Sequence, residues 1–515
     1  MSPAKTCLLI LEAVEPELLR AGIAKGELPN LASLCASGWQ GDINLLPGIG
    51  ANALWPSLYT GLPPQHHGRF YHQQLEDGGY SARETHQTAS LTPPFWAALA
   101  AQGRKVVIVD PPKAPPAQGP ELCHISNWRS HFSYRGELAV HPAGLSGELT
   151  EAGLQSDQCP CLAQRFTSST GYDARKLSKR LEEMIAGSRD LILNRIRHHD
   201  WDLFVAGLGA GHCAGHQLWH CHDPEYPGHI SAAEGDLLGA VYQALDSAAG
   251  DIIANLPADT TLLVFVGPGM GPGHVHPALM GQLLDALDPA TSRGPGKLRQ
   301  HLTQLWRQLP AGWRRRLVRA GHWADQGLQR ADFRHRPCFP VLTNDNVGGI
   351  RINLKGREEH GQIAPEDYSA YLDQLASQIA GLHNAETGEP LVTCLVKTRE
   401  LYPGGELGAM PDLLVEWNEG APVRAVTGPG LPGLEVTYPP KWSGAHNQHA
   451  MLILRETLSG RTTPGGTLPA DSGVLDIAAT ISEACGGERR VGEGRSLLPW
   501  PVAEPSPELA LQADG

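Results

Sequence analysis

The chain has 515 residues, 41% of them hydrophobic, so it can bury a large core as one domain with insertions or as two to three domains. Its formal net charge of -13 argues against general nucleic-acid binding. No apolar run approaches the roughly 20 residues that cross a bilayer, and the early strand-like start is unlike a secretory signal. Because the ten cysteines are scattered, we expect a reduced, cytoplasmic protein without a membrane span.

Apolar runs alternate with helical patterns along most of the chain. The runs that predict strands are residues 7–11, 105–109, 203–206, 261–266, 391–396 and 412–415. Apolar residues at helical spacing in 174–198 and 365–382 fit crossovers between parallel strands. This rhythm predicts an α/β fold with a mainly parallel sheet sandwiched by helices.

Two stretches interrupt the strand rhythm and predict insertions, a cap at residues 111–171 and a basic helical insertion at 277–336. We expect one domain over residues 1–500 that carries both, followed by a flexible tail at 501–515. The segment 293–336 holds ten arginines and Lys297. An amphipathic helical pair with a solvated basic face is the preferred interpretation, while an anion-attracting lobe, a membrane-surface patch or a partner face stays open.

Residues 211–223 hold four histidines, two cysteines and an aspartate directly after a predicted strand. If this segment opens a helix, His212, His216 and His220 lie along one face, where adjacent pairs can bind one ion. The carboxyl ends of strands are also where α/β proteins build their sites. The pattern therefore predicts a metal site, with a polar helix face carrying incidental histidines as the alternative.

Six landmarks then follow one another along the chain. They are the segments 9–16 (LILEAVEP), 26–31 (GELPNL), 55–64 (WPSLYTGLPP) with His67-Gly68, 269–271 (GMG), 410–413 (MPDL) and 443–446 (SGAH). In order and spacing they resemble the alkaline phosphatase superfamily, in its type I phosphodiesterase/nucleotide pyrophosphatase branch, over about residues 7–499. The resemblance implies an alkaline phosphatase-like fold and a small-molecule substrate, expected to be anionic. A homodimer is left open.

In that superfamily two metal ions at the carboxyl ends of the strands activate a threonine or serine nucleophile. The resemblance places one metal site at His212, His216 and His446, with histidine where the family has an aspartate. Three neutral histidines suit one divalent ion and leave positions open for water or substrate. Zinc is the first choice, and iron or copper are the alternatives.

The other metal site and the nucleophile are missing. Glu12 stands at the first-strand aspartate, Ala51 at the nucleophile, and Gly267-Pro268 at the Asp-His pair. We therefore expect water activated by the ion to replace the side-chain nucleophile, with Glu12 as catalytic base or as a ligand. The alternative for Glu12 is a structural carboxylate that caps a helix or pairs with an arginine.

Further residues are candidates for the pocket, because they flank the implied ligands or end predicted strands. They are Ala51, Asn52, Asp110, His220, Gly267, His274, His276, Asn447 and His449. His274 and His276 are also candidate replacement ligands, while His220 is a candidate to fix the geometry around the ion. Neither Asn52 nor Ser57 is a convincing replacement nucleophile.

Three classes of function remain open. The preferred one is a metal-dependent hydrolase that works with one ion and water. The second is a mononuclear iron or copper enzyme with redox or lyase chemistry on the same scaffold. The third is a non-catalytic descendant that binds a ligand or partner, although drift alone does not preserve three convergent histidines.

Overall fold

The computed structural model describes residues 5–71, 73–84, 92–129, 138–154, 173–226, 229–230, 235–276, 278–288, 333–341, 343, 346–404, 408–436, 442–458, 461–462 and 465–498. Most of the predicted basic insertion, part of the predicted cap and the whole tail at 501–515 lie outside these residues.

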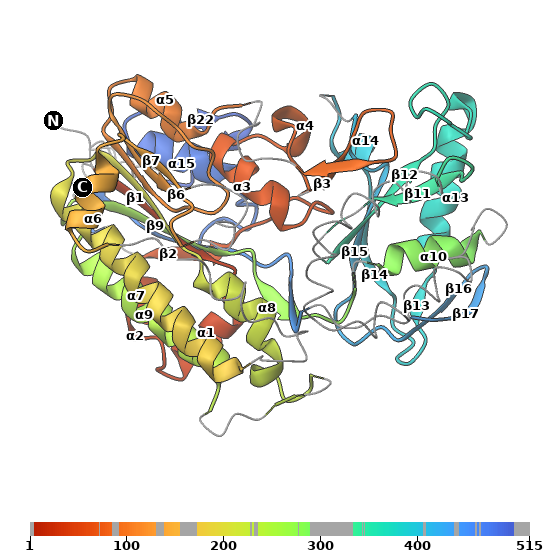
Figure 1. The fold of residues 1–515 in the computed structure, drawn as a ribbon, viewed down its shortest axis with the longest axis horizontal. Helices are drawn as coiled ribbons and strands as arrows, with labels where there is room; N and C mark the ends of the chain where they lie inside the picture. The colour runs from red at the N-terminus through yellow and green to blue at the C-terminus, as the bar shows by residue number, and fades with distance from the viewer. Residues whose placement is uncertain are drawn as a thin grey trace, which may run out of the picture.

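An eight-stranded sheet forms the centre of the larger lobe (Figure 1). Its strands, in spatial order, are β2 (Trp39–Asp42), β19 (Met451–Arg455), β9 (Thr261–Gly267), β1 (Thr6–Glu12), β8 (Leu203–Leu208), β5 (Val106–Val109), β6 (Leu122–Ser126) and β7 (Ala139–His141). The five strands from β9 to β6 are parallel, whereas β19 and β7 run antiparallel to their neighbours. The predicted fold class, a mainly parallel α/β sheet, is confirmed.

Helices cover both faces of this sheet, which is why its strands are continuous apolar runs. Along β1, Leu9 and Leu11 enter one core, while Leu8 and Ile10 enter the other. The first core is closed by α1 (Pro16–Ala24), α2 (Pro29–Ser37), α7 (Ala174–His198), α8 (Ala210–His222) and α9 (Leu237–Ala254). The second is closed by α3 (Ala51–Thr60), α5 (Phe95–Ala101) and α15 (Asp476–Ala484).

A smaller lobe is built on a four-stranded antiparallel sheet (Figure 1). Its strands are ordered β11 (Cys338–Val341), β12 (Val347–Ile352), β15 (Leu413–Trp417) and β14 (Val392–Lys397). A separate core joins this sheet to α10 (Leu279–Leu287), to α13 (Tyr368–Ala380) and to β16 (Ala425–Gly428) and β17 (Leu431–Glu435). These last two strands belong to a three-stranded sheet, which β13 (His383–Asn384) completes.

The smaller lobe corrects two expectations. The apolar runs 391–396 and 412–415 form β14 and β15 of the antiparallel sheet instead of extending the central one, and the helix predicted over 365–382 packs on that sheet. An apolar run specifies a buried strand but not which sheet it joins. The landmark residue Asp412 is structural here, because it accepts hydrogen bonds from Ile352 N, Tyr368 Oη and the Arg357 guanidinium at 2.6–2.9 Å.

The predicted cap at 111–171 also differs from the structure. Residues 122–126 and 139–141 are β6 and β7 at the edge of the central sheet, and they are followed by α6 (Leu145–Glu151). Their short length and the Pro-rich segment before them hide the strand pattern. The described part of the predicted insertion at 277–336 includes α10, which belongs to the smaller lobe.

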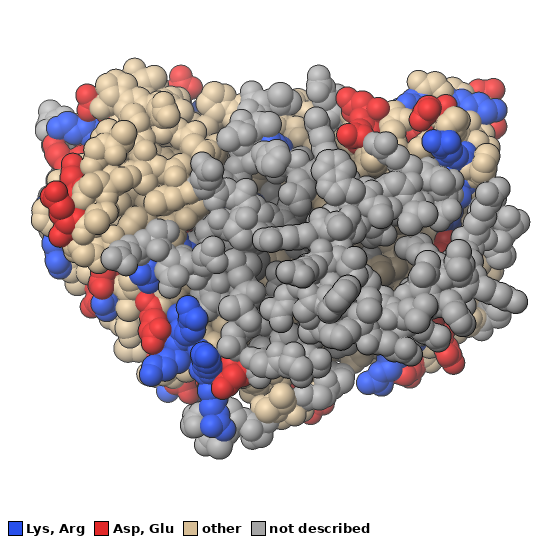
Figure 2. All heavy atoms as spheres, in the orientation of Figure 1, with Lys and Arg blue, Asp and Glu red and all other residues tan. Residues whose placement is uncertain are grey.

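The remaining described elements are short. They are α4 (Pro64–His67), β3 (Gln73–Leu75), β4 (Ala82–Glu84), β10 (Met270–Pro272), the 3-10 turn Pro365–Asp367, α14 (Thr398–Leu401), β18 (Gly444–His446), β20 (Thr457–Leu458), β21 (Arg461–Thr462), β22 (Arg490–Val491) and β23 (Gly494–Arg495). None of the described helices is long and apolar enough to span a bilayer. On the face in Figure 2, basic and acidic side chains are interspersed along the described edges.

Candidate metal centre

Three histidines from two distant segments meet at the carboxyl end of the central sheet. His212 and His216 lie one turn apart on α8, and His446 ends β18. Their ring centroids are 4.8, 4.9 and 5.0 Å apart, and one potential ligand atom from each lies within 4.8 Å of the others. Nitrogen atoms bound to one zinc ion at about 2.1 Å in tetrahedral geometry are about 3.4 Å apart, so small side-chain movements suffice to close the site.

Glycines allow the backbone segments that carry these histidines to approach one another. β18 pairs antiparallel with β10, which places His446 opposite Met270 and brings Gly444 against α8. A Cβ at Gly444 would stand 2.3 Å from the Gly215 carbonyl oxygen, and one at Gly211 would stand 2.5 Å from the Glu12 carbonyl oxygen. Any larger residue at these two positions would force α8 away from its neighbours.

The hydrogen bonds of the three rings leave a nitrogen suited to metal binding on each. His212 Nδ1 donates to Glu12 Oε1 over 3.2 Å, and His216 Nδ1 donates to the Gly444 carbonyl over 2.8 Å. In both rings Nε2 then carries the lone pair, the usual arrangement of ligating histidine. The Nδ1 atom of His446 is buried and makes no hydrogen bond of good geometry among the described residues, although the Gly269 backbone lies close enough to the ring to raise its pKa slightly. Three imidazoles with one orphaned nitrogen fit a divalent ion such as zinc.

Electrostatics keep His446 neutral. Burial lowers its pKa well below 6.5, and the charges of His212, His216 and Lys113 lower it further. A neutral imidazole is the form that binds a metal.

Glu12 is buried at the end of β1, and its carboxylate contacts the imidazole of His212. Carboxylates that accept from a ligating histidine fix the ring and raise its basicity, so the contact favours a positioning role for Glu12. Glu12 does not belong to the three-histidine group itself. Its role as a base stays a prediction.

The positions of the second metal site and the nucleophile carry no replacement ligand. Ala51 is the buried first residue of α3, and Gly267 pairs in register with Glu12 at the end of β9. The side chain of Asn52 lies outside the described part of the chain.

Ser57 does not replace the lost hydroxyl. It is buried on α3, where its Oγ lies 2.8 Å from His67 Nε2. Because His67 Nδ1 accepts from Arg69 N over 3.1 Å, Nε2 carries the proton and donates to Ser57. Burial lowers the pKa of His67 to about 3, so this histidine is a poor base for a serine nucleophile.

Asp110 lies just after β5, at the same carboxyl edge of the sheet as Glu12. Its carboxylate accepts from Trp128 N at 3.1 Å and Arg129 N at 2.9 Å, which fixes the loop after β6. Burial raises the pKa of Asp110 to about 6, and the charge of Glu12 contributes to the rise.

The other histidine candidates lie outside the three-histidine group. His220 is buried one turn beyond His216, with its Nε2 3.3 Å from Cys221 Sγ. His274 Nδ1 donates to the Glu419 carbonyl over 2.7 Å, and His276 Nδ1 accepts from Ala278 N over 3.0 Å. Each of these three histidines therefore contacts a neighbour outside the three-histidine group.

Sequence reasoning did not single out Glu15, which organises the neighbouring loops. Its carboxylate accepts from Met270 N at 2.9 Å, Asn447 Nδ2 at 2.7 Å and His449 Nδ1 at 2.9 Å. The one available signal was its position at the start of a helix, directly before Pro16, where a side-chain acceptor caps the first turn.

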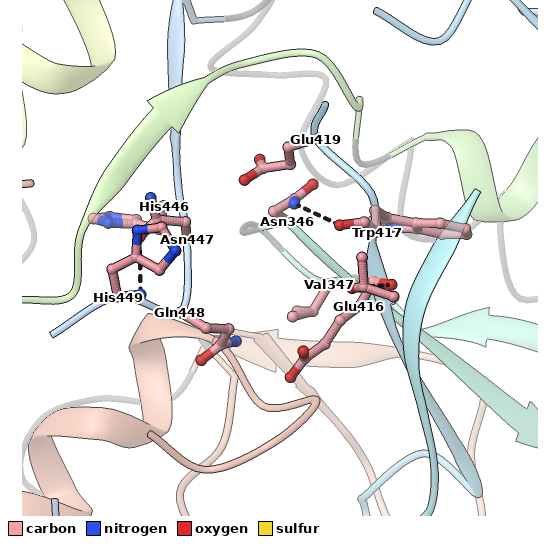
Figure 3. Close-up of a pocket in the computed structure, with 11 residues that line it drawn as sticks. Asn346, Val347, Glu416, Trp417, Glu419, His446, Asn447, Gln448 and His449 are labelled. Atoms are coloured by element: carbon pink, nitrogen blue, oxygen red, sulfur yellow. Dashed lines mark hydrogen bonds between the residues drawn. The ribbon is translucent and has the colours of Figure 1, made fainter. Parts of the chain in front are cut away.

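Asn447 and His449 line a pocket of about 180 Å³ beside His446 (Figure 3). Its opposite wall comes from the smaller lobe and includes Asn346, Val347, Glu416, Trp417 and Glu419. No local pattern in the sequence indicated this wall, because it forms only where the two lobes meet.

Comparisons with known proteins agree with this architecture. The model of the type I phosphodiesterase/nucleotide pyrophosphatase family matches residues 6–430. Phosphonoacetate hydrolase from Sinorhizobium meliloti 1021 has a similar fold in complexes with phosphonoformate and phosphonoacetate. The TM-score is 0.52 in both cases, at 12% and 13% identity, over 94% of this chain and 96% of that one.

Murine ectonucleotide pyrophosphatase/phosphodiesterase 5 gives a TM-score of 0.46 at 12% identity, over 97% of each chain. No curated protein sequence matches the chain. The family match and the shared fold place the chain in the type I phosphodiesterase/nucleotide pyrophosphatase family of the alkaline phosphatase superfamily, a family of metal-dependent hydrolases.

Proposed function

We propose that the protein is a hydrolase that uses one divalent ion, held by His212, His216 and His446, and water as its nucleophile. The observation that carries the proposal is the convergence of three histidines in a chain that has Ala51 where the family resemblance places the nucleophile. A methyl group cannot attack an ester, so a covalent intermediate at that position is ruled out chemically.

Zinc is the proposed ion, which when bound supplies Lewis-acid activation and brings the pKa of water to about 7. The chain's own residues prepare the site for it. Glu12 and the Gly444 carbonyl hold the rings of His212 and His216 at fixed orientations through their Nδ1 atoms. Glu12 is also the proposed acceptor of the proton that water loses. Substitution of Glu12 can separate this role from its role in orienting the His212 ring.

The proposed substrate is a small molecule with an anionic group at the three-histidine site. Lys113 lies close enough for its charge to lower the pKa of His446, so it adds positive potential on that side. The matching family is one of phosphodiesterases and nucleotide pyrophosphatases, and the phosphonoacetate hydrolase complexes, which share the fold, contain small phosphonates.

Metal analysis of protein purified without chelator tests the proposal. We expect about one zinc ion per wild-type chain, the stoichiometry of a single three-ligand site, and almost none in His446→Ala. His198→Ala is the matched control, because this exposed histidine ends α7 before the amino end of β8, whereas His212 and His216 follow the carboxyl end of that strand.

The other possible outcomes of the metal analysis distinguish the alternatives. Full occupancy in His446→Ala would refute the ligand set. Iron or copper in the wild type would favour redox or lyase chemistry, and a folded wild type without metal would favour a binding protein. Chelation should abolish turnover of aryl phosphate esters, and added zinc should restore it.

A further inference from the structure

We propose that the pocket beside His446 binds a cationic, hydrogen-bond-donating group, such as a primary ammonium, at the end of the substrate opposite its anionic group. The inference rests on the proposed function, because it assumes that the anionic group occupies the three-histidine site.

The pocket adjoins the metal centre, because His446 belongs to both. Residues His446, Asn447 and His449 form one wall, and the smaller lobe forms the other (Figure 3). Its volume of about 180 Å³ is below the roughly 300–1,000 Å³ of pockets that hold drug-sized ligands. The space therefore suits a small polar group better than a nucleoside.

Two acceptors at this pocket lack a hydrogen bond of good geometry. The Glu419 Oε1 and Asn346 Oδ1 atoms are buried and have no such partner within the described part of the protein, although the Asn346 side chain lies close enough to Glu419 to lower the pKa of that carboxyl. In Figure 3 the Glu419 carboxylate points across the pocket toward the wall that carries His446. Buried acceptors without a donor are costly, so the site is suited to a ligand that donates several hydrogen bonds.

The charge of the lining selects a cation. Glu416 and Glu419 both line the pocket, and no lysine or arginine does so among the described residues. Burial raises the pKa of Glu419 well above 4.5, and the nearby charge of Glu15 raises it further. His449 also lines the pocket, and its hydrogen bond to the Glu15 carboxylate raises the pKa of the imidazole, so the positive charge that His449 can carry is already paired with Glu15. An ammonium group would favour the ionised carboxylate, whereas a second anion would meet like charge.

Calorimetric titration of the zinc-loaded full chain with two matched probes tests the inference. Phosphoethanolamine and propyl phosphate have similar length and differ in the terminal ammonium or methyl group. We expect the wild type to bind phosphoethanolamine at least about tenfold more tightly, the effect of one charge-assisted contact. Glu419→Gln should remove this preference without changing its affinity for propyl phosphate.

Two further variants complete the experiment. Glu416→Gln keeps an acceptor for Gly48 N, which Glu416 Oε1 binds at 2.6 Å, and should also reduce the preference. It replaces Glu419→Gln as the test if that variant does not fold. Glu366→Gln, at an exposed position of the smaller lobe, should behave as wild type.

The outcomes separate this inference from the proposed function. Equal affinity for the two probes, binding of neither probe, or a preference that survives both pocket substitutions would overturn the inference and indicate a water-filled cavity. A preference for phosphoethanolamine without turnover of any ester would support the pocket and count against the hydrolase. Turnover of propyl phosphate without a preference between the two probes would support the hydrolase and count against the pocket.

Discussion

Gly444→Ala should weaken metal binding although it removes no ligand. The added Cβ would stand 2.3 Å from the Gly215 carbonyl oxygen and 3.1 Å from that of Gly271. Because an ordinary carbon–oxygen contact is about 3.3 Å, β18 has to move away from α8 by about 1 Å. Both obstructing atoms belong to the backbone, so no side-chain rotation relieves the clash.

This displacement acts directly on the metal centre. It carries His446, two residues further along β18, away from His216 and lengthens the 2.8 Å hydrogen bond from His216 Nδ1 to the Gly444 carbonyl. Zinc–nitrogen bonds of about 2.1 Å tolerate changes of only about 0.2 Å, so the side chains have to move further before all three ligands reach the ion, and this weakens binding. We expect zinc affinity to fall about 100-fold and overpacking to cost about 1–3 kcal/mol of stability.

Competition with a chromophoric chelator measures the zinc affinity, and thermal unfolding of the metal-free protein measures the stability cost. Gly433→Ala is the control, because an added Cβ there has nothing within 4 Å. Wild-type zinc affinity in Gly444→Ala would refute the reasoning, since the close approach of α8 and β18 would then not be what holds the ligands together.

Three further predictions concern single carboxylates and the lost nucleophile. Glu12→Gln should keep the fold and weaken zinc binding about 10- to 100-fold, because a neutral amide orients His212 less firmly. Unchanged zinc affinity and unchanged turnover would exclude both roles of this carboxylate. Burial raises the pKa of Asp110 from 3.8 to about 6, so the folded protein retains a proton that the unfolded chain releases. As pH rises from about 4 through 6, the wild type should lose up to about 3 kcal/mol of stability that Asp110→Asn does not lose. Urea unfolding of both proteins at the two ends of this range checks it, and parallel pH profiles would contradict it. Incubation with a labelled aryl phosphate should leave no phosphorylated protein, because Ala51 offers only a methyl group, and a trapped phosphoprotein would disprove this.

Local pattern in the sequence determined the central layer and two of the three metal ligands. The apolar runs at β1, β8 and β9 have no polar alternation because helices cover both faces, so they are recognisable as buried strands. His212 and His216 are neighbours for a helical reason alone, their spacing of four residues. The third ligand, His446, came from the family resemblance, since no periodicity links it to α8.

Only the tertiary structure decided which partners these elements meet. It separated His220 from the metal group, moved the runs at 391–396 and 412–415 into a second sheet, and brought Glu419 to the pocket. Periodicity reports which face of an element is buried, because neighbouring residues along one element set that face. Which distant segment covers the face depends on backbone approach, as at Gly444 and Gly215, where the absence of a side chain allows the contact that forms the metal site.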